Sequence, residues 1–186
     1  MIKKIIPSKT WLTYDTNPSI RQKCALVDIN NLNQTDFDLM DKMIAYIDAT
    51  YEDKAEKYDI VPGLAIAANQ LGINKQIVYL HFDEDGVEYK YMLMNPKILS
   101  SSLAKTYLKH GEGCLSVLDE HEGVSIRYKT VKVKAYDYLT KQEVIINAKG
   151  LLAICLQHEC DHLNGLLFYD RIGEIPLNAM PYKTKE

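Results

Sequence analysis

The segment LQHECDHLNGLLF (156–168) carries residues that could bind a metal ion and use it for hydrolysis. His158 and His162 are four positions apart, so on a helix both imidazoles lie on one face, one turn apart. Glu159 falls at the edge of that face, where its carboxylate could reach a water on the ion without binding the ion. The simpler interpretation is two core histidines and a surface glutamate. A catalytic site of this kind normally takes three protein ligands, and this segment supplies two.

The third ligand is expected upstream of this segment. Zinc endopeptidases take theirs from downstream, but Phe168 stands where the extended motif has histidine, and only Glu174 and Glu186 follow as carboxylates. Upstream, Cys114 lies in the glycine-punctuated stretch HGEGCLSV (110–117). A thiolate with two imidazoles suits a divalent transition ion and leaves one position for water. Three isolated histidines compete with Cys114 for this role: His81, His110 and His121.

The first half of the chain predicts one helix followed by antiparallel strands. Apolar residues recur at helical spacing within 31–58, which indicates an amphipathic helix, and Thr35 with Asp38 is its expected N-terminal cap. Strand-like runs at 75–82 and 88–95 flank Asp85-Gly86, which predicts a β-hairpin.

The second half predicts another hairpin and a final helix. The hairpin pairs 130–139 with 143–148, and the helix covers about 151–164 and ends at Gly165. Helix first, antiparallel strands next and helix last predict an α+β fold, with the strands packed around a C-terminal HExxH metal-binding helix and an N-terminal amphipathic helix. No repeat or linker interrupts the pattern, so 1–186 is expected to form a single catalytic domain.

Composition narrows the class of protein. With 47% hydrophobic and 25% charged residues the chain has an ordinary globular composition. The net charge of -3 without a polybasic run gives no reason to expect a nucleic-acid or membrane partner. The N-terminus lacks the apolar core of a signal peptide, so a cytoplasmic location is expected. In that reducing compartment the cysteines should remain thiols: Cys24, Cys114, Cys155 and Cys160.

Three segments resemble peptide deformylases, and they occur in the order found in that family. They are GLAIAANQLG (63–72), EGCLS (112–116) and QHECDHLNG (157–165). The resemblance spans residues 63 to about 172, more than half of the chain. The form EGCLSV and the long segment before residue 63 are similar to the branch called type 2.

The resemblance implies a reaction and its participants. The family removes the N-formyl group from the N-terminal methionine of newly synthesised polypeptides, so N-formylmethionyl peptides and nascent chains are the expected partners, and contact with the ribosome stays open. One divalent ion is implied, Fe²⁺ first, with Zn²⁺, Ni²⁺ or Co²⁺ able to occupy the site. By position, the metal ligands would be Cys114, His158 and His162. Glu159 would activate the water on the metal, and Gln70 with the backbone N–H of Leu115 would hold the formyl oxygen.

The resemblance also implies residues around the reacting atoms. Substrate-binding positions carried over are Gly63, Leu64, Ala65, Ile154 and Cys155. Ala65 stands where the family has a second glycine, so its methyl group could narrow the cleft or demand a different φ, and a modified substrate preference is expected. Arg127 falls where the family carries a strand arginine and is expected to brace Glu112 behind the ligands.

Two alternatives remain at this point. A general zinc endopeptidase would need a third ligand downstream of the HExxH segment. A non-catalytic metal- or peptide-binding relative of the deformylases would keep the fold without the reaction.

Overall fold

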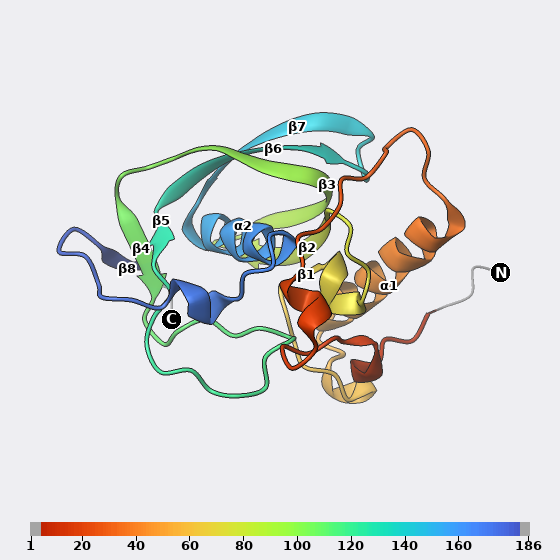
Figure 1. The fold of residues 1–186 in the computed structure, drawn as a ribbon, viewed down its shortest axis with the longest axis horizontal. Coiled ribbons are helices and arrows are strands. Elements are labelled where there is room, and N and C mark those ends of the chain that lie inside the picture. The colour runs from red at the N-terminus through yellow and green to blue at the C-terminus, as the bar shows by residue number, and fades with distance from the viewer. Residues whose placement is uncertain (1–4, 183–186) are drawn as a thin grey trace.

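An antiparallel sheet forms the centre of the computed structural model, which describes residues 5–182 (Figure 1). Its strands, in spatial order, are β1 Ala65–Ala67, β2 Ile77–Glu84, β3 Val87–Ser101, β6 Thr130–Asp137 and β7 Gln142–Lys149. A smaller sheet contains β5 Arg127–Tyr128, β4 Lys105–Leu108 and β8 Met180–Tyr182. The α-helices are α1 Gln34–Tyr51 and α2 Gly150–Leu163. Single 3₁₀ turns occupy Lys9–Trp11, Pro18–Arg21, Glu56–Tyr58, Ala68–Leu71 and Phe168–Arg171. The predicted α+β class, with an antiparallel sheet and two helices, is confirmed.

The two hairpins have the turns expected from their sequences. Glu84 pairs with Val87 across Asp85-Gly86, and both turn residues have positive φ (54° and 81°), as the tight hairpin turn requires. The second hairpin closes at the Asp137–Gln142 pair. β3 runs beyond the expected end at residue 95, because it continues past a register shift after Met94 to pair with β6.

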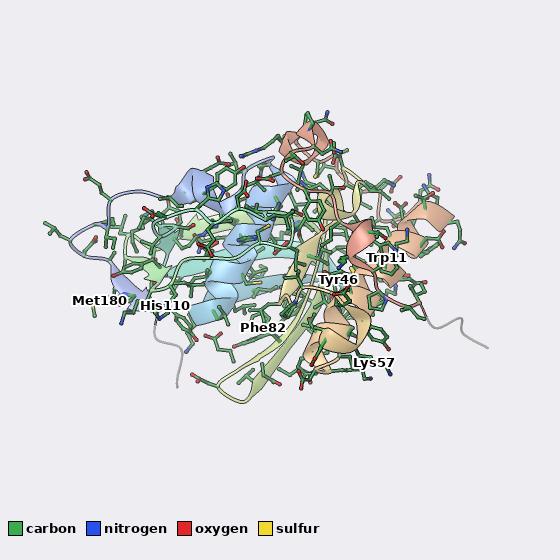
Figure 2. All side chains as sticks on the ribbon, turned by 90° about the horizontal axis from the view of Figure 1, so that it is seen from below. Trp11, Tyr46, Lys57, Phe82, His110 and Met180 are labelled. Atoms are coloured by element: carbon green, nitrogen blue, oxygen red, sulfur yellow. The ribbon has the colours of Figure 1, made fainter. Side chains whose placement is uncertain are left out.

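The sheet separates two cores, one under each helix. Along β2, Ile77 and Tyr79 pack with α1, while Leu80 and Phe82 pack with α2. Strand geometry explains this division, since successive side chains point to opposite faces. Figure 1 shows α2 under the curve of β3, β6 and β7, with α1 beyond β1 and β2. In Figure 2 Tyr46 of α1 and Phe82 of β2 lie on these two sides. Both faces of β2 are therefore buried.

The N-terminal cap of α1 lies two residues before the expected one. The Asn33 side chain accepts the Asp36 N–H at 3.2 Å, and the Asp36 carboxylate accepts the Asn33 N–H at 3.1 Å. The expected pair, Thr35 with Asp38, lies inside the helix, and Asp38 accepts a bond from Gln34 instead. The prediction of the cap residues is wrong, because two overlapping patterns fit a capping box and Asp36 gains an ion pair with Lys75.

Helix α2 begins at Gly150 and ends where glycine allows the chain to turn. Gly165 has φ 74° and donates its N–H to the His162 carbonyl at 3.0 Å. An added Cβ there would lie 2.0 Å from the backbone oxygen of Arg21. This glycine thus lets the N-terminal segment pack directly on the end of α2.

Two observations bear on the expectations about the cysteines and about membranes. All four cysteines are free thiols within the described chain. Between residues 5 and 182, no helix has both the length and the apolar character needed to cross a membrane.

We expect Asp36→Asn to lower the free energy of unfolding at pH 7 by about 1 kcal/mol, as loss of a helix cap does. Burial raises the pKa of Asp36, but the bonds from Lys75 and the Asn33 N–H lower it more, to below its ordinary 3.8. A lowered folded-state pKa gives stability that is fully present above the ordinary value and is lost as the pH falls from that value through the folded-state pKa. Denaturant unfolding of the parent and of Asp36→Asn should therefore show a stability difference that begins to shrink near pH 3.8 and vanishes below the lowered pKa of Asp36. Asp38→Asn is the control, and an equal effect there would restore the cap expected from the sequence.

We expect Gly165→Ala to destabilise the fold by about 3 kcal/mol or more, because it combines a positive φ with a backbone clash. Gly173→Ala is the matched control, since a Cβ there meets no atom of residues 5–182 within 4 Å. Thermal unfolding of both variants should show a large loss for the first and almost none for the second. Similar stabilities would contradict the close packing at Gly165.

Candidate metal centre

Cys114, His158 and His162 come together although they lie far apart in the sequence. Both histidines are on α2, and Cys114 lies in the loop between β4 and β5. Their ligand atoms lie within 4.8 Å of one another, and Cys114 Sγ is 3.2 Å from His162 Nε2. Three side chains gathered in this way could hold one metal ion.

The competing third ligands lie elsewhere. His81 is held between Asp48 and Glu88, at 2.7 and 2.8 Å from its two ring nitrogens. His121 stacks on Tyr169 with 4.0 Å between ring centroids. His110 and Glu174 are exposed and are not members of the Cys114 group found among the described residues. Glu186 lies outside the described residues.

The donor set has the properties a metal site needs. His162 is fully buried, and its Nδ1 has no hydrogen-bond partner among the described residues. Burial, followed by the nearby His158 and Arg127, lowers the pKa of His162 well below its usual value, which favours the neutral imidazole that binds metals. Burial also lowers the pKa of His158, but its bonds with Cys114 and Glu112 raise it more. One thiol and two imidazoles are donors that fit a divalent transition ion.

A buried ion-pair chain lies behind His158. Glu112 accepts His158 Nδ1 at 2.8 Å, and Arg127 binds both oxygens of Glu112 at 2.7 and 2.8 Å. Arg127 continues to Asp161 at 2.5 Å, and Asp161 is bound from its other side by Arg171. Burial raises the pKa of Glu112, but Arg127 and His158 lower it more, to about 2. Glu112 is therefore ionised near neutral pH and orients the ring of His158, which is how hydrogen-bond partners hold histidines that bind metals.

Glu159 follows His158 in α2, but unlike Glu112 its carboxylate has an oxygen that no described residue binds. The residue is 4% exposed, and its Oε2 has no hydrogen-bond partner among the described residues. Burial is the main reason that its pKa is raised to about 7. A carboxylate with a pKa near neutrality can both accept and return a proton.

Gln70 and Leu115 border the same site from two other segments. Gln70 Oε1 accepts the Ala67 N–H at 2.8 Å, which directs Nε2 toward Ser116 Oγ at 3.1 Å and Cys114 Sγ at 3.6 Å. The Leu115 N–H has no acceptor within residues 5–182. The side chain of Leu115 packs on Gly63, where an added Cβ would lie 3.0 Å from it. Two N–H donors are therefore present beside the Cys114 thiol.

These residues open into a cleft of about 730 Å³. All five positions expected to bind substrate line it: Gly63, Leu64, Ala65, Ile154 and Cys155. Ala65 lies in the extended strand β1 without a positive φ, so the structure accommodates its methyl group without the unusual backbone considered for this position.

Several residues around the site were not identified from the sequence. Ser116 accepts the Gln70 amide, and Asn69 donates to the His162 carbonyl at 2.8 Å. Asp161 joins two arginines, and Phe168 stacks on His158 at 6.4 Å. Asn69 and Asp161 lie inside the motifs 63–72 and 157–165, and a polar residue at such a position is the feature from which a role in the site could have been predicted. Nothing in the local sequence distinguishes Phe168 from a core residue.

An antiparallel α+β fold with a Cys/His/His group and a buried glutamate beside it defines a class of metal-dependent hydrolases. Residues 9–176 match the family model described as polypeptide deformylase. The chain belongs to the peptide deformylase family.

Relatives support this assignment over nearly the whole chain. The peptide deformylase of Malacoplasma penetrans is 47% identical over 174 residues, which cover 94% of this chain and 93% of that protein. The peptide deformylase of Mycoplasma pneumoniae is 45% identical, over 98% of this chain and 83% of that one. Among solved structures, the peptide deformylase of Ehrlichia chaffeensis aligns with a TM-score of 0.70 at 29% identity, covering 91% of this chain and 89% of that chain.

We expect Glu112→Gln to weaken metal binding by about 10- to 100-fold, because His158 loses its charged acceptor while the side-chain shape is kept. Competition with a chromophoric chelator measures the dissociation constant. Glu143→Gln is the control, since this carboxylate pairs with Lys134 on the outer face of the sheet and is largely exposed. Equal metal affinities for Glu112→Gln and the parent protein would remove the support for this role.

Proposed function

We propose that the chain is a peptide deformylase that hydrolyses the formamide of N-formylmethionyl peptides and nascent chains and releases formate. The observation that carries this proposal is the gathering of Cys114, His158, His162, Glu159 and Gln70 at one cleft in a chain of this family. The solved deformylase of Acinetobacter baumannii, 28% identical with a TM-score of 0.69, was crystallised with Met-Ala-Ser bound. That ligand has the sequence pattern of a deformylated product.

Cys114, His158 and His162 would hold the ion, with Fe²⁺ as the first expectation and Zn²⁺, Ni²⁺ or Co²⁺ as substitutes. When bound, such an ion supplies Lewis acidity and makes water a nucleophile near neutral pH. The chain supplies the geometry for this: α2 presents both imidazoles, and Glu112 with Arg127 behind them would keep the ring of His158 in place.

Glu159 is proposed as the general base and acid. It is buried in the cleft wall with an unpaired oxygen, so it can accept the proton of the attacking water. As the C–N bond breaks, the same carboxyl group returns that proton to the departing amine of methionine. Its pKa of about 7 suits both steps near neutral pH.

Gln70 and the Leu115 N–H are proposed to bind the formyl oxygen. Negative charge develops on this oxygen as the tetrahedral centre forms, and donors fixed in advance stabilise it without reorganising. The Ala67 N–H holds the Gln70 side chain by its carbonyl oxygen. One amide N–H donates to Ser116 Oγ at 3.1 Å, and the N–H that faces Cys114 Sγ at 3.6 Å would turn to the substrate. Packing of Leu115 on Gly63 holds the second donor.

The methionine side chain is proposed to occupy the apolar part of the cleft beside Leu64, Ile154 and Cys155. The formyl group then faces Glu159, because this residue lies one helical turn beyond Cys155 on α2. The peptide beyond methionine would extend along Gly63–Ala65, where Ala65 alters the preference for its side chains.

The domain organisation, the location and the partners of the protein are also proposals. Residues 1–186 are treated as one catalytic domain whose C-terminal helix α2 carries the HExxH ligands. A cytoplasmic location, contact with the ribosome and membership of the type 2 branch stay predictions. Neither an endopeptidase nor a non-catalytic relative is favoured, because Cys114 offers a third ligand upstream of the two histidines and both Glu159 and Gln70 are present.

Anaerobic formate release from a formyl-methionyl tripeptide, with Fe²⁺-loaded protein, is the direct test. We expect Glu159→Gln to lower kcat by about 100- to 10,000-fold with the metal retained, and Gln70→Leu to lower it by about 100- to 1,000-fold. The unformylated tripeptide and a folded protein substrate are the controls for peptide-bond cleavage. Absence of formate from the metal-loaded, folded parent would refute deformylation, and cleavage of the folded protein would favour an endopeptidase.

A further inference from the structure

The N-terminal end of α2 is capped by a residue from a distant strand. Lys149 stands at the cap position, but its side chain makes no capping bond within residues 5–182. Glu84, near the end of β2, accepts the Leu151 N–H at 2.7 Å and the Leu152 N–H at 3.2 Å. Gly150 makes this approach possible, because a Cβ there would lie 2.2 Å from Glu84 Oε1. The helix that carries the metal ligands is therefore anchored to the sheet through one carboxylate.

A second residue holds that carboxylate. The Tyr182 hydroxyl donates to Glu84 Oε1 at 2.6 Å, from β8 at the other end of the sequence. Burial, and then the Glu84 carboxylate, raise the pKa of Tyr182, so its hydroxyl stays protonated as a donor. Glu84 Oε1 thus receives two hydrogen bonds, and bonds to a charged acceptor are the stronger kind.

Tyr182 also connects to a second segment that lines the cleft. β8 pairs in parallel with β4, with Leu108 as the partner of Tyr182. Leu108 and Leu151 both line the cleft. Figure 2 shows His110, just after β4, and Met180 of β8 at the same end of the molecule. Tyr182 is therefore linked to two lining residues, to Leu108 through strand pairing and to Leu151 through Glu84.

We propose that Glu84 and Tyr182 form a clasp that sets the width of the methionine pocket, and that both are positioning residues for substrate selectivity. The proposal rests on the function proposed above for the cleft. Its physical basis is that Leu151 is the first residue of α2 to donate to Glu84 and also lines the cleft. A displacement of about 1 Å at such a wall is enough to change the fit of a bound side chain.

The clasp differs in its effects from a contact that only stabilises the fold. A purely stabilising contact would, when removed, lower the unfolding temperature and reduce activity toward all substrates equally. A contact that sets pocket width would change the ratio between substrates. One methylene in a well-formed apolar pocket is discriminated by about 10- to 200-fold, so this ratio is a sensitive measure of the wall.

The test compares Glu84→Gln and Tyr182→Phe with the parent. The control is Asp83→Asn, because Asp83 is the neighbour of Glu84 in β2 and its carboxylate binds Tyr51 instead. One measurement is the ratio of kcat/KM for formyl-methionyl and formyl-leucyl tripeptides. The other is hydrogen exchange of the Leu151 and Leu152 amides by NMR in the zinc-loaded protein, with one metal per chain verified in every variant.

We expect Glu84→Gln to reduce the substrate ratio by about 3- to 10-fold, mainly through KM for the methionyl peptide, and to speed exchange at both amides by about 10-fold or more. Tyr182→Phe should change both in the same direction and by less, and Asp83→Asn should change neither. An unchanged ratio or unchanged exchange in Glu84→Gln would overturn the clasp, and so would an equal loss for both peptides.

If Glu84→Gln fails to fold, Tyr182→Phe is the deciding variant, since it removes a single oxygen atom. An unchanged substrate ratio and unchanged amide exchange in Tyr182→Phe would then refute the proposal. The experiment also distinguishes failure of the deformylase function from failure of the clasp. A parent that releases no formate from either peptide refutes the deformylase function, whereas the exchange rates show whether Glu84 and Tyr182 anchor α2.

Discussion

The buried pairing of Arg127 with Glu112 is the interaction on which the arrangement of the site depends. It joins the loop that carries Cys114 to α2, because Glu112 binds His158 and Arg127 binds Asp161. Both charges of the pair are almost completely buried, so each compensates the desolvation of the other. Loss of one partner would leave a buried charge, and such losses generally cost about 3–5 kcal/mol. The same contact therefore stabilises the fold and orients a proposed metal ligand.

The two cores explain how the chain keeps the reacting groups in place. β2 is buried on both faces, with α1 packed on one and α2 on the other, so the same strand fixes the positions of both helices. Gln70 is placed by the 3₁₀ turn after β1, and Asn69 in the same turn binds the end of α2 through the His162 carbonyl. The proposed oxyanion donor and the proposed ligands are thus connected by hydrogen bonds as well as by apolar packing. Rigid support of this kind is what electrostatic stabilisation of a transition state requires.

Local sequence patterns predicted the parts of the fold that depend on near neighbours. The Asp85-Gly86 hairpin follows from backbone preferences of two residues, and the end of the second helix follows from Gly165. The cap of α1 was assigned wrongly, since the choice between two overlapping patterns is made partly by Lys75, 39 positions away. The short strands β1, β4 and β8 do not follow from the local sequence, because strands of three or four residues depend on the partners they meet, and β5 is expected only through the strand arginine of the family.

In the proposed site too, some residues could be predicted from local sequence and others depend on distant partners. The histidine spacing is local and could be recognised, and Cys114 was found through its loop and the family motif. Asp161, Ser116 and Glu84 act through partners 34, 46 and 67 positions away, which no local pattern encodes. The pairing of Glu112 with Arg127, 15 positions apart, was expected only through the resemblance, and the structure places the two side chains in contact.

The separation of Cys114 from His162 has a consequence for how the protein acquires its ion. The two residues are 48 positions apart, with β5, β6 and β7 between them. Closing a loop of that length costs conformational entropy, which contacts made elsewhere in the fold have to offset. A three-ligand pocket therefore belongs to the folded chain and is absent from the unfolded one. An ion bound there would add its binding free energy to the stability of the folded state.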